Sequence, residues 1–147
     1  MRQVHKKSGE QALGRSRGGF STKIHVTVDA LGNPLRFRLS AGQAHDITQA
    51  QALLDGFAFE RLIADRGYAA HHFAELITQQ GIQMVIPPHQ RRKQPYDYDQ
   101  WLYRERHLVE CLINKLKHFR RIFSRFEKLD RSYLGFLNFV GTLIWLR

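Results

Sequence analysis

Residues 103–123 read YRERHLVECLINKLKHFRRIF, and this stretch combines an apolar side with a strongly basic one. At about 100° per residue on a helix, Tyr103, Arg106, Glu110 and Lys117 fall within one stripe roughly 60° wide. The opposite side is apolar and consists of Leu108, Val109, Leu112, Ile113, Leu116, Phe119 and Phe123. The pattern predicts one long amphipathic helix over about residues 99–123.

The charges on this predicted helix are mostly of one sign. A solvated helix face commonly pairs Glu with Lys or Arg at i,i+4. On the stripe described above, Glu110 is the single acid, and the cations around it are Arg106, Lys117, Arg120 and Arg121. A plain ion pair between Glu110 and Arg106 is the alternative, and such a pair contributes little at a surface. The excess of cations favours a site that handles a polyanion.

The composition limits the class of protein. The chain has 147 residues, of which 43% are hydrophobic, so it is long enough for one globular domain. A net charge of +10 favours nucleic acid as the partner over an anionic membrane surface. The sequence has no apolar run of the ~20 residues that a membrane span requires. The lone Cys111 excludes an internal disulfide framework and a zinc site built on cysteines. We expect a cytoplasmic protein.

The chain divides into a basic N-terminal segment, residues 1–19, and one α/β domain, residues 20–147. The first segment ends in GRSRGG and is interpreted as a flexible arm, or as an arm whose Arg15 and Arg17 contact phosphates. Within the domain, apolar residues alternate on both sides of a turn at residues 29–34, which predicts a β-hairpin with one buried face.

Two short apolar runs, residues 61–64 and 84–86, predict buried strands, and the helix between them is expected to stop at Gly81. Asp46 is interpreted as the N-cap of a helix that runs to about Leu54. A last helix is expected from about Ser132 to the end. This order of elements predicts an α/β fold with a mixed sheet flanked by helices.

Asp65 follows the first of these strands and precedes Gly67. The carboxyl ends of strands in α/β sheets are where ligands and metals collect, although an acid in this place can also simply cap the next turn. If Asp65 and Glu110 converge in a cationic cleft, their oxygens suit Mg²⁺ or Mn²⁺, which can promote in-line displacement at phosphorus.

Other residues give weaker indications. Arg91, Arg92 and Lys93 lie in a basic loop that either contacts DNA or is simply solvated. Trp101 and Trp145 are expected to be core anchors, with base stacking as the alternative for Trp101.

Four separated motifs resemble bacterial insertion-sequence transposases of the DDE type, in the branch numbered five. Tyr103, Arg106, Glu110 and Lys117 match, by their spacing, the signature around the catalytic glutamate of that family. The other three motifs are the segments Gly14–His25, Leu62–Tyr68 and Lys117–Ile122. The resemblance covers nearly the whole chain from about Ala12.

The resemblance implies a ribonuclease H-like fold and a DNA transposase that cleaves DNA and transfers strands with a divalent metal. It implies that Asp65 and Glu110 are catalytic, metal-binding acids. Tyr103, Arg106 and Lys117, together with Arg121, would bind double-stranded DNA at the transposon ends and the target. The active form would be a homo-oligomer.

One departure from the family pattern stands out. The family uses three acids, and only Glu10 precedes the segment Gly14–His25, without strand alternation. The first strand of the sheet, with its acid, is therefore expected to be missing. An upstream polypeptide would then complete the domain, the chain being a partial or downstream-frame product. The alternative is a non-catalytic DNA-binding fragment with a regulatory role or no activity.

Overall fold

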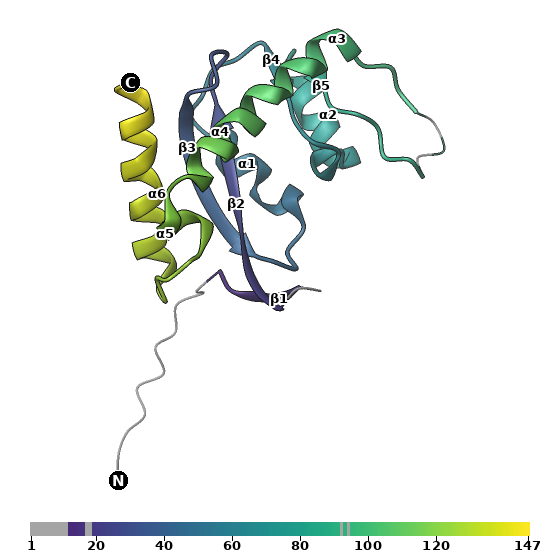
Figure 1. Cartoon of the computed structure of the whole chain (residues 1–147). Coiled ribbons are helices and arrows are strands. Elements are labelled where there is room, and N and C mark those ends of the chain that lie inside the picture. The colour runs from purple at the N-terminus through teal and green to yellow at the C-terminus, as the bar shows by residue number, and fades with distance from the viewer. Residues whose placement is uncertain (1–11, 17–18, 92, 94) are drawn as a thin grey trace.

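The structure, a computed structural model, describes residues 12–16, 19–91, 93 and 95–147. Its described strands form two small sheets (Figure 1). One sheet is antiparallel and has the strand order β1-β2-β3, and the other is the parallel pair β4-β5. The strands are β1 (Gly14–Ser16), β2 (Gly19–Val28), β3 (Pro34–Ala41), β4 (Arg61–Ile63) and β5 (Gln83–Val85). The predicted α/β class is confirmed. The prediction of one mixed sheet is wrong for the described part of the chain, because the antiparallel and parallel strands do not pair with each other there.

Strands β2 and β3 form the predicted hairpin. Asp29 fixes its turn, since its Oδ1 accepts hydrogen bonds from the backbone amides of Leu31 at 2.9 Å and Asn33 at 2.8 Å. Gly32 has a φ of 83°, which glycine adopts without steric cost. The turn therefore sets the register in which apolar and polar residues of the hairpin alternate.

The larger core lies between one face of this hairpin and two helices, α4 (His107–Lys117) and α6 (Asp130–Trp145). Figure 1 shows α6 running alongside β3 at the edge of the molecule. The buried residues of this cluster are Phe37, Leu112, Leu116, Ile122, Tyr133, Leu137 and Val140. The apolar side of the 103–123 stretch thus packs inward, as its periodicity predicts.

A smaller core lies around the parallel pair. It is formed with α1 (Ala50–Leu54) and α2 (His71–Gln79), and its buried residues are Ala50, Phe73, Ile77 and Ile86. Gly81 follows α2 with a φ of 73°, so the predicted stop of this helix is confirmed.

The predicted single helix over residues 99–123 is wrong in its continuity. It consists of α3 (Gln100–Tyr103), a 3-10 turn (Arg104–Arg106), α4, and α5 (Arg120–Phe123). The first piece begins where the Asp99 carboxylate accepts hydrogen bonds from two backbone amides of α3.

The break between α4 and α5 has a packing reason. Phe119 takes an extended backbone conformation, with φ −87° and ψ 106°. The chain turns there and places Ile122 in the larger core, where its carbonyl accepts a hydrogen bond from the Tyr133 hydroxyl at 2.8 Å. A straight helix would not follow this path.

The prediction that Asp46 is an N-cap is also wrong. Asp46 is the first residue of a 3-10 helix (Asp46–Gln49), and its cap position, His45, makes no side-chain capping bond. The Asp46 carboxylate instead pairs with the Lys23 ammonium at 2.9 Å. A charged partner offers a stronger hydrogen bond than a helix amide does.

Both tryptophans were expected in the core, and that prediction is wrong. Trp101 is 75% exposed, with the Arg104 guanidinium 4.1 Å from its ring centroid. Trp145 is 50% exposed, and its Nε1 donates to the Pro34 carbonyl. No described helix is long and apolar enough to cross a membrane.

The predicted N-terminal arm is described only in part. Residues 14–16 of the range 1–19 form β1, which pairs with the start of β2. Residues 1–11, 17 and 18 lie outside the described residues, so the arm as a whole stays a prediction.

Two glycines of α6 test the close packing of this helix on β3. A Cβ on Gly141 would lie 2.8 Å from Phe37 Cε2, whereas a Cβ on Gly135 would meet nothing within 4 Å. We expect Gly141→Ala to lower the free energy of unfolding by about 1–3 kcal/mol through overpacking. Gly135→Ala should raise it by up to about 1 kcal/mol through helix propensity. Urea denaturation measures both, and equal stabilisation by the two substitutions would contradict the packing described here.

Candidate active site

Asp65 lies just beyond the carboxyl end of β4, before a 3-10 turn (Arg66–Tyr68). Its side chain makes no capping hydrogen bond to that turn, so the capping alternative is wrong. The carboxylate is directed elsewhere: its Oδ1 lies 3.1 Å from Arg106 Nη1.

Arg106 joins this acid to a second one. It stands at the N-terminus of α4, and its Nη2 pairs with Oε1 of Glu110 one helical turn later. Because one guanidinium contacts both carboxylates, the structure brings together Asp65 and Glu110, which come from separate segments of the chain. Their carboxylates remain accessible, with 58% and 56% of the side chains exposed.

Tyr103 completes the group of contacts. Its hydroxyl donates to Asp65 Oδ1 at 3.5 Å, a long hydrogen bond, and its ring lies 5.7 Å from the Arg106 guanidinium carbon. Tyr98 meets the Tyr103 ring edge-on at 5.6 Å between centroids. We call Asp65, Tyr103, Arg106 and Glu110 the acid–arginine cluster.

The charges in this cluster hold Arg106 and Tyr103 in their protonated forms. Burial alone would lower the pKa of Arg106, but Asp65, Tyr103 and Glu110 together raise that pKa above its ordinary value. Partial burial and the nearby Asp65 raise the pKa of Tyr103, against the lowering effect of Arg106. The cluster therefore combines a permanent cation, a neutral phenol and accessible carboxylate oxygens.

Carboxylate oxygens are hard ligands and suit Mg²⁺ or Mn²⁺, which often bind through one or two carboxylates and leave further positions to water and phosphate. Within the described residues there is no group of three or more His, Cys, Asp or Glu side chains arranged to hold a metal ion. The two acids of the cluster fit a site that depends on the substrate, or on another carboxylate, for its remaining ligands.

The other predicted residues lie outside the acid–arginine cluster. Lys117 is seven residues beyond Glu110, roughly 10 Å along the helix axis. It lines a depression of about 610 Å³ between the start of β2 and α5. Arg121 pairs with Glu127 at 3.2 Å and lies 5.5 Å from the Phe136 ring centroid, so it has structural partners of its own.

The basic loop and the arm are described incompletely. Arg91 and Lys93 are exposed. Arg92 and Arg17 lie outside the described residues, and of Arg15 only the backbone, in β1, is described. Their contacts with DNA stay predictions.

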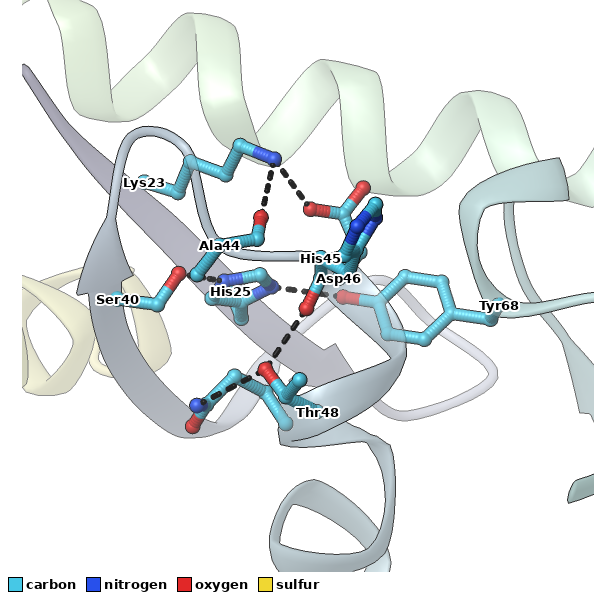
Figure 2. A network of polar contacts seen from close by, with 9 residues as sticks. Lys23, His25, Ser40, Ala44, His45, Asp46, Thr48 and Tyr68 are labelled. Carbon is cyan, nitrogen blue, oxygen red and sulfur yellow. Dashed lines mark hydrogen bonds and ion pairs between the residues drawn. The ribbon is translucent and has the colours of Figure 1, made fainter. Parts of the chain in front are cut away.

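The sequence interpretation missed a polar network beside the cluster. It consists of Lys23 and His25 on β2, Ser40 on β3, and Asp46 and Tyr68 (Figure 2). The only signal available was alternation, because Lys23 and His25 lie on the face of β2 opposite its apolar residues. Their partners come from other elements, which no local pattern identifies.

We predict that Arg106 matters little for stability. Its ion pairs join half-exposed carboxylates, and exposed pairs contribute about 1 kcal/mol or less. Arg106→Gln should therefore change the free energy of unfolding by less than about 1 kcal/mol in urea denaturation. Arg125→Gln is the control and should cost more, because Arg125 donates to Thr22 and to the carbonyls of Glu127 and Lys128. A larger loss for Arg106→Gln than for Arg125→Gln would contradict this account.

Comparison with known proteins identifies the family of the chain. Residues 2–143 match the transposase DDE domain family. The chain is 39% identical over 131 residues to a Brucella ovis protein named as a transposase for insertion sequence element IS6501, covering 86% of this chain and 99% of that protein. It is 31% identical over 150 residues to a Burkholderia cepacia protein named as a transposase for IS402, covering 94% of this chain and 68% of that protein. No solved structure matches the chain. The chain belongs to the DDE transposases of bacterial insertion sequences.

Proposed function

We propose that this chain carries the catalytic acids with which an insertion-sequence transposase cleaves DNA and transfers strands. The observation that supports this most directly is the convergence of Asp65 and Glu110 on one guanidinium. The two acids are the ones that match the family motifs. They are accessible, and they lie in a protein with a net charge of +10.

Asp65 and Glu110 would hold the divalent metal, Mg²⁺ or Mn²⁺. When bound, such an ion supplies activation of a water or 3′-hydroxyl and stabilisation of the leaving oxygen at phosphorus. Arg106 keeps the two carboxylates close together and offers a fixed positive charge to a phosphate of the DNA backbone. Tyr103, protonated beside Asp65, orients that carboxylate.

We propose a ribonuclease H-like arrangement for the complete domain. An antiparallel hairpin followed by a parallel pair, with an acid at the end of β4, is consistent with it. The third carboxylate implied by the family would come from a polypeptide that supplies another strand, and the active complex would be a homo-oligomer on DNA at the nucleoid.

DNA contacts outside the acid–arginine cluster are assigned to the basic side chains. Lys117 and Arg121 extend the positive face of α4 and α5 away from Glu110. Arg91, Arg92 and Lys93, with Arg15 and Arg17, would add phosphate contacts. Phosphate contacts of this kind position a protein on double-stranded DNA without reading its sequence.

A second function is favoured by one observation. No group of three metal-holding side chains is found among the described residues. A chain with two acids could bind transposon ends without cleaving them and so act as a regulatory fragment. The two functions differ in the role of Glu110. Catalysis requires it as a metal ligand, whereas DNA binding alone does not.

The proposed chemistry predicts a specific effect of removing either acid. Asp65→Asn and Glu110→Gln should each weaken binding of Mn²⁺ to the purified chain and reduce transposition of the encoding element in cells by about 100-fold or more, because each replaces a charged carboxylate by a neutral amide with a single oxygen. Mn²⁺ affinity is measured by electron paramagnetic resonance of the free ion, and transposition by a plasmid-to-chromosome assay.

Glu105→Gln is the matched control, since Glu105 is an exposed acid in the turn preceding α4. It should leave both readouts unchanged. If Glu110→Gln binds Mn²⁺ and supports transposition like the natural chain, the catalytic proposal is wrong. If the natural chain binds DNA but neither binds Mn²⁺ nor contributes to transposition, the regulatory alternative stands.

A phosphate contact by Lys117 predicts a change in salt dependence. Lys117→Ala should reduce the slope of log affinity against log salt by about 0.9, the value of one phosphate contact on duplex DNA. Lys115→Ala is the control, because Lys115 lies on another side of the same helix. Fluorescence anisotropy with a labelled duplex, at about 50 to 300 mM salt, measures the slope for both variants. An unchanged slope for Lys117→Ala would show that Lys117 does not contact a DNA phosphate.

A further inference from the structure

His25 is buried in the middle of β2, where it is 5% exposed. Its Nδ1 lies 2.8 Å from the Tyr68 hydroxyl, and its Nε2 lies 2.7 Å from the Ser40 hydroxyl. Figure 2 shows the imidazole between these two groups, so that both ring nitrogens are used. Burial lowers the pKa of His25, and the neutral ring can accept from one hydroxyl while it donates to the other.

Tyr68 belongs to the same short turn as Asp65. Its backbone amide donates to the Asp65 carbonyl at 2.9 Å, and the next amide, of Ala69, donates to the Arg66 carbonyl at 3.0 Å. The position of the tyrosine side chain therefore constrains the position of the acid. The hydrogen bond of the Tyr68 hydroxyl to His25 thus anchors the turn that begins at Asp65.

The carboxylate of Asp46 makes a second contact with the same turn. A Cβ on Gly67 would lie 2.6 Å from Asp46 Oδ2, so the carboxylate of Asp46 lies against this glycine. Lys23 holds that carboxylate through Oδ1 at 2.9 Å and also donates to the Ala44 carbonyl at 2.8 Å (Figure 2). The turn thus contacts the hairpin network at two points, the Tyr68 hydroxyl and Gly67.

These side-chain contacts matter because the strands themselves do not make the connection. In the described part of the chain, β4 pairs only with β5, and no ladder joins it to the hairpin. The hairpin contributes Lys23, His25 and Ser40 from its β2 and β3 strands. The polar network is therefore a direct link between the antiparallel sheet and the strand end that carries Asp65.

A purely structural role for His25 is the simplest alternative, because buried histidines are commonly hydrogen-bonded core residues. A purely structural role would not require that Tyr68, one of the two hydrogen-bond partners of His25, lie in the turn that begins at Asp65, the proposed metal ligand. Outer partners that orient a ligating carboxylate change metal affinity by about 10- to 100-fold when removed. A structural residue elsewhere in the core lacks this effect.

We propose that Ser40, His25 and Tyr68 form a positioning relay that holds Asp65 in the orientation required for metal binding. The proposal rests on the proposed function in that it takes Asp65 as a metal ligand. His25 and Tyr68 act through Asp65 and do not themselves touch metal or DNA.

Tyr68→Phe tests the relay, because it removes one hydroxyl and leaves the ring in place. Tyr133→Phe is the matched control: Tyr133 is buried, and its hydroxyl makes one hydrogen bond, to Ile122, in the other core cluster. Both variants should shift the urea midpoint to a similar extent. Only Tyr68→Phe should weaken Mn²⁺ binding by about 10-fold and lower transposition in cells by a similar factor.

Ser40 provides the rescue arm of the experiment. Ser40→Ala should weaken Mn²⁺ binding in the same direction as Tyr68→Phe, whereas Ser40→Thr, which keeps a hydroxyl, should restore it to within about twofold of the natural chain. Native-state hydrogen exchange gives a readout that needs no metal. In Tyr68→Phe the amides of residues 68–70 should exchange faster, and in Tyr133→Phe they should not.

Two results would overturn the relay. One is unchanged exchange at residues 68–70 in Tyr68→Phe; the other is an equal loss of Mn²⁺ affinity in Tyr133→Phe. Failure of the proposed function is recognised separately, by a natural chain that binds no Mn²⁺ and by Glu110→Gln without effect on transposition. In that case hydrogen exchange still decides whether the relay holds the turn.

Discussion

The arrangement of the site depends on one guanidinium that contacts two carboxylates from distant segments of the chain. Arg106 joins Asp65, at the end of β4, to Glu110, in the first turn of α4. Each carboxylate thus has a cationic partner, while more than half of its side chain stays exposed. The larger core supports this geometry, since the buried Leu112 and Leu116 fix the helix on which Arg106 and Glu110 stand.

The two sides of the site are held by different means. Glu110 is positioned by the apolar packing of α4 against the hairpin, which is non-directional and large in area. On the other side, the turn that carries Asp65 is held by the directional hydrogen bond between Tyr68 and His25, and Gly67 packs against the Asp46 carboxylate. A hydrogen bond restricts the orientation of the groups it joins more than apolar packing does. A carboxylate that binds a metal ion must be held in a defined orientation.

Part of this structure could be predicted from the sequence because it has local causes. The 3.6-residue period placed Arg106 and Glu110 on one face, and the alternation around Asp29 predicted the hairpin. The break at Phe119 could not be predicted, because it depends on where Ile122 packs in three dimensions. Asp46 was misread as a cap for a similar reason: its partner Lys23 is brought to it only by the folded hairpin. The single mixed sheet was wrong because strand pairing is a long-range property.

The central claim is that Asp65 and Glu110 share one divalent ion. The most direct measurement is anomalous diffraction from crystals of the chain grown with Mn²⁺. The account predicts an anomalous peak within coordination distance, about 2.0–2.3 Å, of an oxygen of each of the two carboxylates. A peak bound to only one of them, or Mn²⁺ found elsewhere while Arg106 still joins the two acids, would contradict it.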